Sequence, residues 1–282
     1  MAHRRSVLLA FGALATGLVV LGAVALAVGR DDDSPAPRCR LINPFSVGTP
    51  AAGSNGIHIV EQGYTIVPSS ATTVSMGSIV ANTTDQVAYR TRVVFDVLDD
   101  EGRSVVHDWH RSRLVQEVPV ILPGTRVAVG AAVALTEAAQ ADRDSVARIS
   151  IVPAVTRWLP PGDGNNGLAP VTGKPVPGGS RRDHDGSGFI RYTTESANCA
   201  PLLSRGTSLV FRDAGGTIVG GNIDANWAWH ACEPGTATYV QSADAGLRAV
   251  PASADLDRTE VTVYCDFARP APTQRPGEPV NY

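Results

Sequence analysis

Lysine is almost absent from this sequence. Lys174 is the only lysine among 24 basic residues, and 27 acidic residues leave a formal net charge of −3. A protein that binds nucleic acid normally presents a basic face, so this balance argues against that class. The preference for arginine over lysine, with abundant alanine, valine and glycine, is typical of a GC-rich, actinobacterial genome.

Short patterns that mark catalytic sites are also missing. The sequence has no Gly-x-Ser-x-Gly pattern for a nucleophile and no Cys-x-x-Cys pair for zinc or redox chemistry. The glycine pairs at 215–216 and 220–221 lie in strand and turn contexts rather than before helices, where a phosphate-binding loop would place them. We therefore expect no catalytic residue, no bound metal and no cofactor.

Two stretches resemble metal sites. In His107-Asp108-Trp109-His110 the two histidines would point to opposite faces of a strand, and no further ligand is near, so we expect a solvated loop or strand edge. Residues 163–167 and 183–188 resemble parts of a calcium loop. However, position twelve counted from Asp183, where an EF-hand has glutamate, is Thr194, and we expect acidic, glycine-rich loops without an ion.

A long apolar run near the N-terminus predicts the compartment. Residues 7–28 contain no charged side chain and match the ~20 residues that a helix needs to cross a bilayer. Arg4 and Arg5 precede the run and acidic residues 31–33 follow it, so the positive-inside rule places residues 1–6 in the cytoplasm. We expect a single-pass anchor, with the rest of the chain outside the cell membrane.

A cleaved signal peptide is the alternative. Its apolar region is usually only ~7–15 residues long, but residues 23–25 and 25–27 offer small-x-small cleavage sites. The protein would then be secreted. Cys39 lies well beyond the run in a polar, proline-containing setting, which does not favour a lipid anchor there.

All four cysteines, Cys39, Cys199, Cys232 and Cys265, follow the apolar run. An even number of cysteines in an oxidising compartment predicts two disulfides. We expect Cys199–Cys232, which would close a loop of about thirty residues worth roughly 3–4 kcal/mol, and Cys39–Cys265. The sequence leaves the other two pairings open.

The region after the apolar run is typical of β-structure. Residues 29–56 are rich in Pro, Gly, Ser and Ala and predict a stalk. In residues 89–98 the side chains of Tyr89, Phe95 and Val97 alternate with polar ones, which predicts a strand with one buried face. Further strands are expected at 57–60, 64–67, 74–81, 115–121, 126–135 and 146–152, and a helical turn is expected only around 136–140.

Three landmarks recur along the chain in the same order. Residues 95–99 have a counterpart at 209–213, Pro123-Gly124 at Pro234-Gly235, and residues 141–144 at 254–257. We interpret them as two copies of one β-unit. The sequence therefore predicts an all-β protein with two tandem Ig-like antiparallel β-sandwiches at 57–157 and 188–268, a Gly/Pro linker at 158–187 and a proline-rich tail at 269–282.

The pattern Phe95-x-Val97-Leu98-Asp99, followed by Gly102 and a later Pro-Gly, resembles the FxLYD-type domain of bacterial surface proteins. Val97 and Leu98 stand where that family has Leu and Tyr, and the second copy departs further. The resemblance implies a β-sandwich and no catalytic residues. Independently of it, Asp99 or Asp213 at the strand end can cap a turn in which Gly102 or Gly216 adopts a positive φ.

Trp227 and Trp229 lie on one face of an expected strand next to Cys232. Two exposed indole rings on one side would form a platform for carbohydrate or peptide. The alternative, which we favour, is that they pack onto the disulfide or the neighbouring domain.

Together these features predict a non-enzymatic, membrane-anchored surface protein that binds or scaffolds an envelope component, either a protein or a glycan. The membrane contact would be the N-terminal helix, and nucleic acid is not expected as a partner. One alternative is an envelope hydrolase whose site forms between the two domains, which a buried ionisable cluster in a cleft would favour. The other is a structural spacer.

Overall fold

The computed structural model describes residues 39, 41, 43–68, 72–160, 168–225, 230–243 and 249–267. Residues Cys39–Tyr282 cluster into one compact unit. The expected transmembrane helix at 7–28 and the proline-rich tail at 269–282 lie outside the described residues. Within the described ranges, no helix is both long enough and apolar enough to cross a membrane.

The described chain is all-β, as the sequence predicts, and its sheets are antiparallel. The strands are β1 (Thr49–Pro50), β2 (Ile57–Val67), β3 (Thr73–Asn82), β4 (Val87–Leu98), β5 (Val115–Ile121), β6 (Arg126–Ala134), β7 (Arg148–Leu159), β8 (Val171–Pro175), β9 (Arg181–Arg182), β10 (Gly188–Ser196), β11 (Leu203–Arg212), β12 (Ile218–Asp224), β13 (Gly235–Ala243) and β14 (Asp255–Asp266).

The helices are short: α2 (Pro44–Val47), α3 (Glu137–Ala141) and the 3₁₀ helices η1 (Asp108–Leu114) and η2 (Arg143–Ser145). The expected helical turn around 136–140 is confirmed by α3. The side chain of Thr136 caps this helix by accepting a hydrogen bond from the amide of Ala139.

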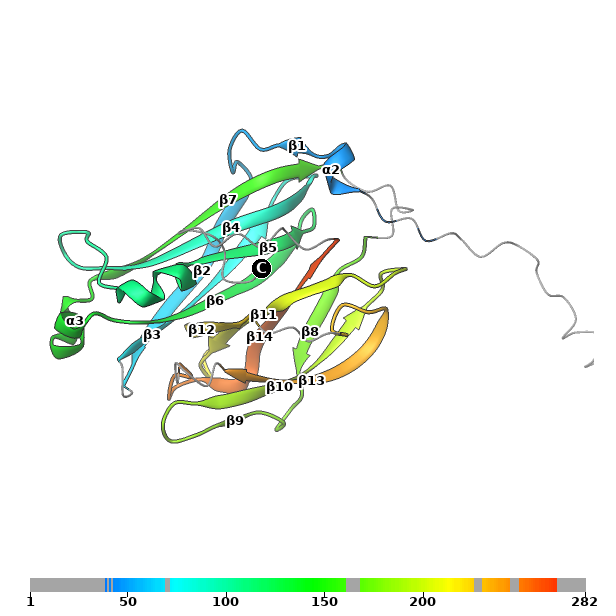
Figure 1. Ribbon diagram of the computed structural model, residues 1–282. Helices are drawn as coiled ribbons and strands as arrows, with labels where there is room; N and C mark the ends of the chain where they lie inside the picture. The colour runs from blue at the N-terminus through cyan, green and yellow to red at the C-terminus, as the bar shows by residue number, and fades with distance from the viewer. Residues whose placement is uncertain are drawn as a thin grey trace, which may run out of the picture. The chain divides into compact units, whose positions relative to one another are not determined.

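Strands β1 to β7 form the first lobe (residues 43–160), coloured blue to green in Figure 1. Its two sheets have the strand orders β1-β7-β4-β5 and β2-β3-β6. The alternation expected in β4 is confirmed, because Val93, Phe95 and Val97 are fully buried. They share a core with Met76 of β3 and Val129 of β6, so the two sheets pack face to face.

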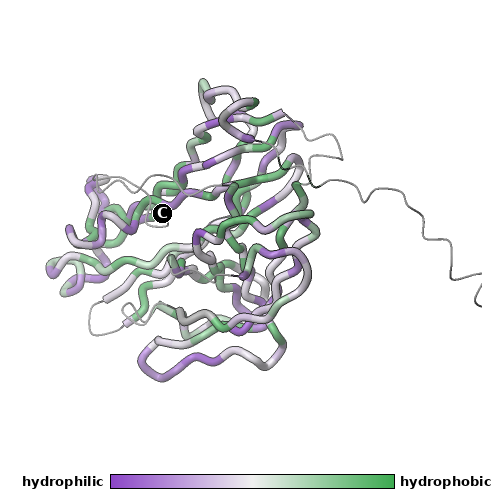
Figure 2. The backbone as a smooth tube through the Cα atoms, turned by 45° about the vertical axis from the view of Figure 1, so that its right-hand side comes forward, coloured by the Kyte–Doolittle hydropathy of each residue, from purple (hydrophilic) through white to green (hydrophobic). Residues whose placement is uncertain are grey.

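Strands β8 to β14 form the second lobe (residues 168–267), a seven-stranded sheet of order β12-β11-β14-β8-β10-β13, with β9 beside β10. Its two halves meet at a single pair, Val261 of β14 with Gly173 of β8. Ile190 and Tyr192 from one half share a core with Leu209 and Phe211 from the other. Short hydrophobic and hydrophilic stretches alternate along the chain (Figure 2).

The two lobes repeat one pairing pattern. In the first lobe β3 pairs with β6 and β4 with β7, and in the second β10 pairs with β13 and β11 with β14. The turns that follow β4 and β11 also match. The Asp99 carboxylate accepts a hydrogen bond from the amide of Arg103 at 2.7 Å, and the Asp213 carboxylate accepts one from Thr217 at 2.8 Å. Gly102 and Gly216 have φ of 78° and 89°, as these turns require.

Two of the expected boundaries need correction. The region expected as a linker, 158–187, contains β8 and β9, and β8 lies inside the second sheet between β14 and β10. The region expected as a stalk, 29–56, includes β1, which pairs with the edge strand β7. Both segments are rich in Pro and Gly, which predicts irregular backbone. A neighbouring strand nevertheless supplies hydrogen bonds to short stretches of such sequence.

The expected disulfide pairing is wrong, although all four cysteines are in disulfides. The bonds are Cys39–Cys199 and Cys232–Cys265. Cys232 and Cys265 are buried in the core of the second lobe, whereas Cys39 and Cys199 are exposed. Cys265 points inward on the same face of β14 as Val261 and Val263, so it meets the cysteine of the covering turn. Cys199 lies on the surface, where it bonds to Cys39 of the N-terminal segment.

A row of glycines brings the lobes into backbone contact. Gly63, Gly77 and Gly130 stand directly opposite one another across β2, β3 and β6. A Cβ atom at Gly77 would overlap the carbonyl oxygen of Gly220, and one at Gly130 would overlap that of Leu209. Because these positions have no side chain, sheet β2-β3-β6 lies directly on β11 and β12 of the second lobe.

We expect Gly130→Ala to destabilise the protein by about 1–3 kcal/mol, because the new methyl group meets backbone that cannot move aside cheaply. Gly53→Ala is the matched control, since a Cβ there meets nothing within 4 Å. Urea unfolding of both variants measures the difference. Equal midpoints for the two variants would contradict direct backbone contact between the lobes.

Candidate functional site

The residues singled out in the sequence do not meet at one place. Trp227 and Trp229, the expected aromatic surface, lie outside the described residues. His107 precedes η1, and His110 within it accepts a hydrogen bond from the amide of Ala134 through Nδ1 at 2.7 Å. Trp109 is 71% exposed and stacks on His110. This stretch is therefore a mostly exposed 3₁₀ helix against β6, and the described residues hold no group of three or more metal-ligating side chains.

Part of the calcium-like sequence can be described. Residues 183–188 form a turn between β9 and β10, where the Asp185 carboxylate accepts hydrogen bonds from the amide and hydroxyl of Ser187. Asp183 pairs with Arg181 at 3.0 Å. These carboxylates are used in local turn contacts. Residues 163–167 lie outside the described part of the chain.

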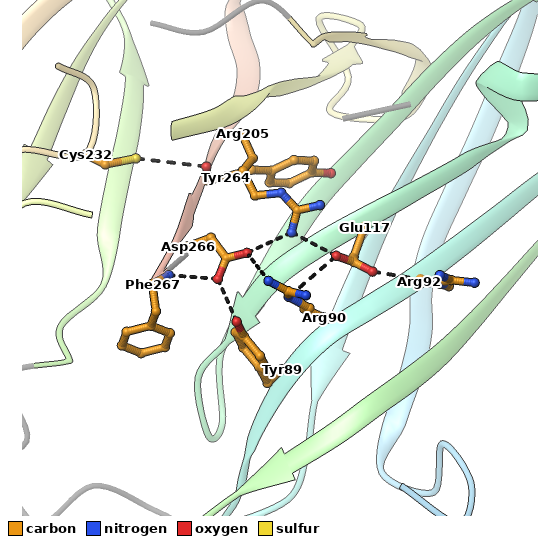
Figure 3. A network of polar contacts seen from close by, with 9 residues as sticks. All are labelled: Tyr89, Arg90, Arg92, Glu117, Arg205, Cys232, Tyr264, Asp266 and Phe267. Atoms are coloured by element: carbon orange, nitrogen blue, oxygen red, sulfur yellow. Dashed lines mark hydrogen bonds and ion pairs between the residues drawn. The ribbon is translucent and has the colours of Figure 1, made fainter. Parts of the chain in front are cut away.

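The principal polar cluster lies at the junction of the two lobes (Figure 3). Arg205 of β11 is fully buried, and its Nη1 donates to Glu117 of β5 and to Asp266 of β14, both at 2.8 Å. Asp266 also accepts a hydrogen bond from the hydroxyl of Tyr89 at 2.9 Å and pairs with Arg90 at 3.4 Å. Arg205 and Asp266 come from the second lobe and the other three from the first, so the cluster joins the lobes.

Charge explains why the cluster contains so many arginines. Glu117 and Asp266 are almost completely buried, and an unpaired carboxylate in such a place would cost several kcal/mol. The planar guanidinium can donate to two carboxylates at once, which the lysine ammonium does less well. Burial, followed by the neighbouring charge of Asp266, raises the pKa of Tyr89 well above its usual range. Tyr89 therefore remains a neutral hydrogen-bond donor.

Arg90 has an unusual backbone. Its φ of 54° is the only positive φ at a non-glycine residue among those described. The β4–β5 ladder pairs Tyr89 with Val120 and Thr91 with Val118 but omits Arg90. The facing residue is Pro119, which has no N–H to donate, so the ladder loses nothing there. The guanidinium reaches Asp266 and lies 5.2 Å from the ring centre of Tyr89.

The second lobe also contributes to the core of the first. Tyr264 of β14 is buried within it, and its hydroxyl donates to Gln116 at 3.3 Å. Gln116 donates in turn to the carbonyl of Gly130. The edge strand β6 receives further bonds from the second lobe, because the hydroxyls of Ser208 and Thr262 accept hydrogen bonds from its amides at 2.7 and 2.9 Å. Side chains thus replace the missing neighbour of β6.

A second ion network crosses the junction nearer to solvent. Arg212 of β11 pairs with Glu61 of β2 at 2.7 Å and with Glu260 of β14 at 2.6 Å. Glu61 also pairs with Arg126 at 3.0 Å. The hydrogen bond from Arg212 lowers the pKa of Glu61 from its ordinary value near 4.5, and this outweighs the opposing effect of burial.

Beside these networks lies the junction groove, a cavity of about 460 Å³. It is lined by the turn between β5 and β6, by residues 168–173 and by β14 from Thr259 to Cys265. Its lining includes Leu122 and Leu168. The wall at 168–170 is fixed by buried Asn198, whose side-chain amide exchanges two hydrogen bonds with the backbone of Ala169.

The buried Arg205 cluster and the junction groove differ in what they can do chemically. A general acid or base must reach its substrate. The carboxylates of Glu117 and Asp266 are enclosed, bound by arginines and absent from the lining of the groove. We interpret the cluster as a structural joint. The groove is open and largely apolar, and it can accept a ligand.

Sequence reasoning missed this joint. Glu117 and Arg205 each stand inside a stretch of small and apolar residues, which is a weak signal of a buried charge. A charged residue in a strand usually faces solvent, however, and nothing local shows that these two would meet across 88 residues of chain. The groove had no sequence signal, because its three walls come from separate segments.

No family model matches the chain, and a search of curated proteins found no match either. The function of the site is therefore argued from its own geometry and chemistry.

Arg205→Ala should lower the free energy of unfolding by about 3–5 kcal/mol, because it leaves two buried carboxylates without their shared partner. Arg182→Ala removes an exposed arginine from β9 and should change stability by less than about 0.5 kcal/mol. Urea unfolding at pH 7 compares them. A similar loss of unfolding free energy in both variants would show that the Arg205 joint contributes little to stability.

Glu61→Gln should alter the acid dependence of stability. The folded-state pKa of Glu61 is lowered, so its stabilisation is present above the ordinary pKa near 4.5 and is lost as pH falls through the folded value. The side chain is 38% exposed, which limits the effect to about 1 kcal/mol or less. Unfolding curves from pH 7 to pH 3.5 should show the variant and the natural protein converging at low pH. If the difference in unfolding free energy between the two proteins were the same at every pH, the lowered pKa of Glu61 would be refuted.

Proposed function

We propose that the protein is a non-enzymatic, membrane-anchored, extracytoplasmic protein that binds or scaffolds an envelope component in the junction groove. The cysteines support the compartment, because all four are in disulfides and such bonds persist in oxidising surroundings. The apolar run at 7–28 supplies the anchor in this proposal. Secretion after cleavage of that segment is the alternative.

The fold supports a binding role within this proposal. The repeated strand pairing is what two tandem Ig-like sandwiches related to the FxLYD type would produce, and the implied family has no catalytic residues. Here the two lobes share a core, two ion networks and a row of backbone contacts. A groove between lobes fixed in this way keeps its shape, which reduces the entropic cost of binding.

The observation that carries the proposal is the groove with an unpaired strand edge along it. Beyond Val261, no described strand forms a ladder pair with β14 on the side of β8, although β8 itself lies beside it. Backbone N–H and C=O groups without a ladder partner can hydrogen-bond an extended polypeptide, and they have no comparable complement in a glycan. Of the two expected partner classes, an envelope protein therefore fits the groove better.

The alternatives receive less support. For an envelope hydrolase, the buried cluster at the junction is enclosed by the lobes instead of lining a cleft. The ionisable residues that do line the groove, Arg126 and Glu260, are paired with Glu61 and Arg212. A spacer would need no groove. The aromatic pair that could argue for a binding platform, Trp227 and Trp229, falls outside the described residues.

Leu168→Asp tests the proposal by placing a charge in the groove. Val152→Asp is the control, since Val152 lies on β7 away from the groove and is 55% exposed. We expect the full-length chain to bind the purified protein fraction of the envelope saturably, and Leu168→Asp to weaken binding at least roughly tenfold. The control should bind normally, with both variants melting within a few degrees of the natural protein.

Absence of saturable binding to the protein fraction, or equal binding by both variants, would contradict the proposal. Protease added to intact cells tests the compartment in the same preparation. Digestion of the described lobes is expected, and full protection would place the chain on the other side of the membrane.

A further inference from the structure

The two disulfides differ in their access to solvent. Cys232 is completely buried and Cys265 is 7% exposed, and both belong to the core of the second lobe. Cys265 borders the junction groove, whose volume of about 460 Å³ is too small for a folded protein to enter. Cys39 and Cys199 are both exposed. Because reduction begins when a thiolate attacks a sulfur atom, a protein thiol can approach Cys39–Cys199 but not Cys232–Cys265.

Cys199 is held in place by its neighbours in the chain. Asn198 is buried, and its side-chain amide exchanges two hydrogen bonds with the backbone of Ala169. On the other side of the cysteine, Leu202 is buried in the core of the second lobe, and its amide donates to the carbonyl of Cys232 at 3.1 Å. These contacts do not involve the sulfur atom of Cys199. The loop therefore keeps its place whether the disulfide is formed or broken.

The N-terminal segment, described at residues 39, 41 and 43–50, is attached differently to the two lobes. On the first lobe β1 forms a ladder with β7, and the carbonyl of Gly48 accepts a hydrogen bond from Arg157. On the second lobe the link is the disulfide, supported by Leu41, which is partly buried against the core. A single partly buried side chain holds a segment only weakly. Breaking the disulfide would therefore detach the segment from the second lobe and leave it on the first.

The two lobes do not depend on this disulfide to stay together. They are joined by the salt bridge between Arg205 and Glu117 and by the glycine row, and neither includes the N-terminal segment. Loss of Cys39–Cys199 should lower the thermal stability, because the unfolded chain gains freedom over a separation of 160 residues. The folded lobes should nevertheless remain joined.

We propose that Cys39–Cys199 is a thiol–disulfide exchange site for a dithiol oxidoreductase of the envelope, and that its reduction releases the N-terminal segment from the second lobe. A thiolate of the oxidoreductase attacks one sulfur atom and forms a mixed disulfide, while the other cysteine leaves as a thiolate and takes up a proton. The second thiol of the oxidoreductase then displaces the remaining cysteine. Two electrons and two protons thus pass to Cys39 and Cys199, and the oxidoreductase becomes a disulfide.

This inference goes beyond the proposed function and shares with it only the extracytoplasmic compartment. Neither Cys39 nor Cys199 lines the junction groove, and Asn198 holds the groove wall independently of the disulfide. Reduction therefore changes how the N-terminal segment is attached and leaves the groove intact. Failure of the experiments below would leave the result of Leu168→Asp in the groove unaffected, and the reverse also holds.

Differential alkylation tests which disulfide is reduced. The full-length chain in detergent is incubated with a reduced thioredoxin-type oxidoreductase, and free thiols are trapped with iodoacetamide and assigned by mass spectrometry. We expect Cys39 and Cys199 to be alkylated at least roughly tenfold faster than Cys232 and Cys265. Equal rates for the two pairs, faster reduction of Cys232–Cys265, or no reduction of either would overturn the proposal.

An oxidoreductase whose second cysteine is replaced by serine stops at the mixed disulfide. It should form a covalent adduct with the natural protein at Cys39 or Cys199. The matched control is the double variant Cys39→Ser with Cys199→Ser, which retains Cys232–Cys265 and should form no adduct. An adduct of equal yield with the double variant would place the attack elsewhere and contradict the proposal. The absence of free thiols in the untreated double variant checks that its second lobe is folded.

Nitroxide labels on the two released thiols test whether the segment leaves. The Cα atoms of Cys39 and Cys199 are 5.4 Å apart in the disulfide, so labels on a segment that stays docked would broaden each other's electron paramagnetic resonance spectra. We expect the spectrum of the reduced, doubly labelled protein to equal the sum of the spectra of Cys39→Ser and Cys199→Ser, each labelled once. Strong broadening after reduction would mean that the segment is not released, against the proposal.

Discussion

The junction between the lobes depends on one buried guanidinium. Arg205 bridges a carboxylate of the first lobe, Glu117, and one of its own lobe, Asp266, in a place without access to solvent. Burying three charges is costly, and the cost is offset only when each finds its partner. The arrangement therefore requires the two lobes to be in register. A shift of one lobe relative to the other would leave at least one of these charges buried without its partner.

Close packing at part of the junction follows from the glycine row. Gly63, Gly77 and Gly130 leave no side chain between the backbones of sheet β2-β3-β6 and those of β11 and β12. Tyr264 extends this contact by reaching into the core of the first lobe. Two domains of one chain normally meet through a smaller and more polar surface and move relative to each other. In this protein the two lobes belong to one compact unit and share a core.

The N-terminal segment joins the same assembly. Its strand β1 pairs with β7 of the first lobe, and Cys39 is bonded to Cys199 of the second. A segment that the sequence alone describes as a stalk is thus attached to both lobes. If the apolar run is the membrane anchor, a force on this N-terminal segment acts on both lobes together.

The sequence by itself determined the local features. Alternation along β4 predicted its buried face, Asp99 and Gly102 predicted the turn after it, and the helical turn was expected around 136–140, where α3 lies. These signals lie within a few neighbouring residues, and backbone geometry converts them directly into structure. The even number of cysteines likewise predicted disulfides, although not which cysteine meets which.

Only the tertiary structure decided the cysteine partners, the Arg205 joint and the groove. Each depends on which strands the folded sheets bring together from distant parts of the chain, and that is set by core packing of whole faces. A charge in a strand, or a cysteine at its end, carries no local mark of its partner. Burial makes an unpaired charge costly, so the fold must bring it a partner. A cysteine bonds to whichever cysteine the fold brings within disulfide distance.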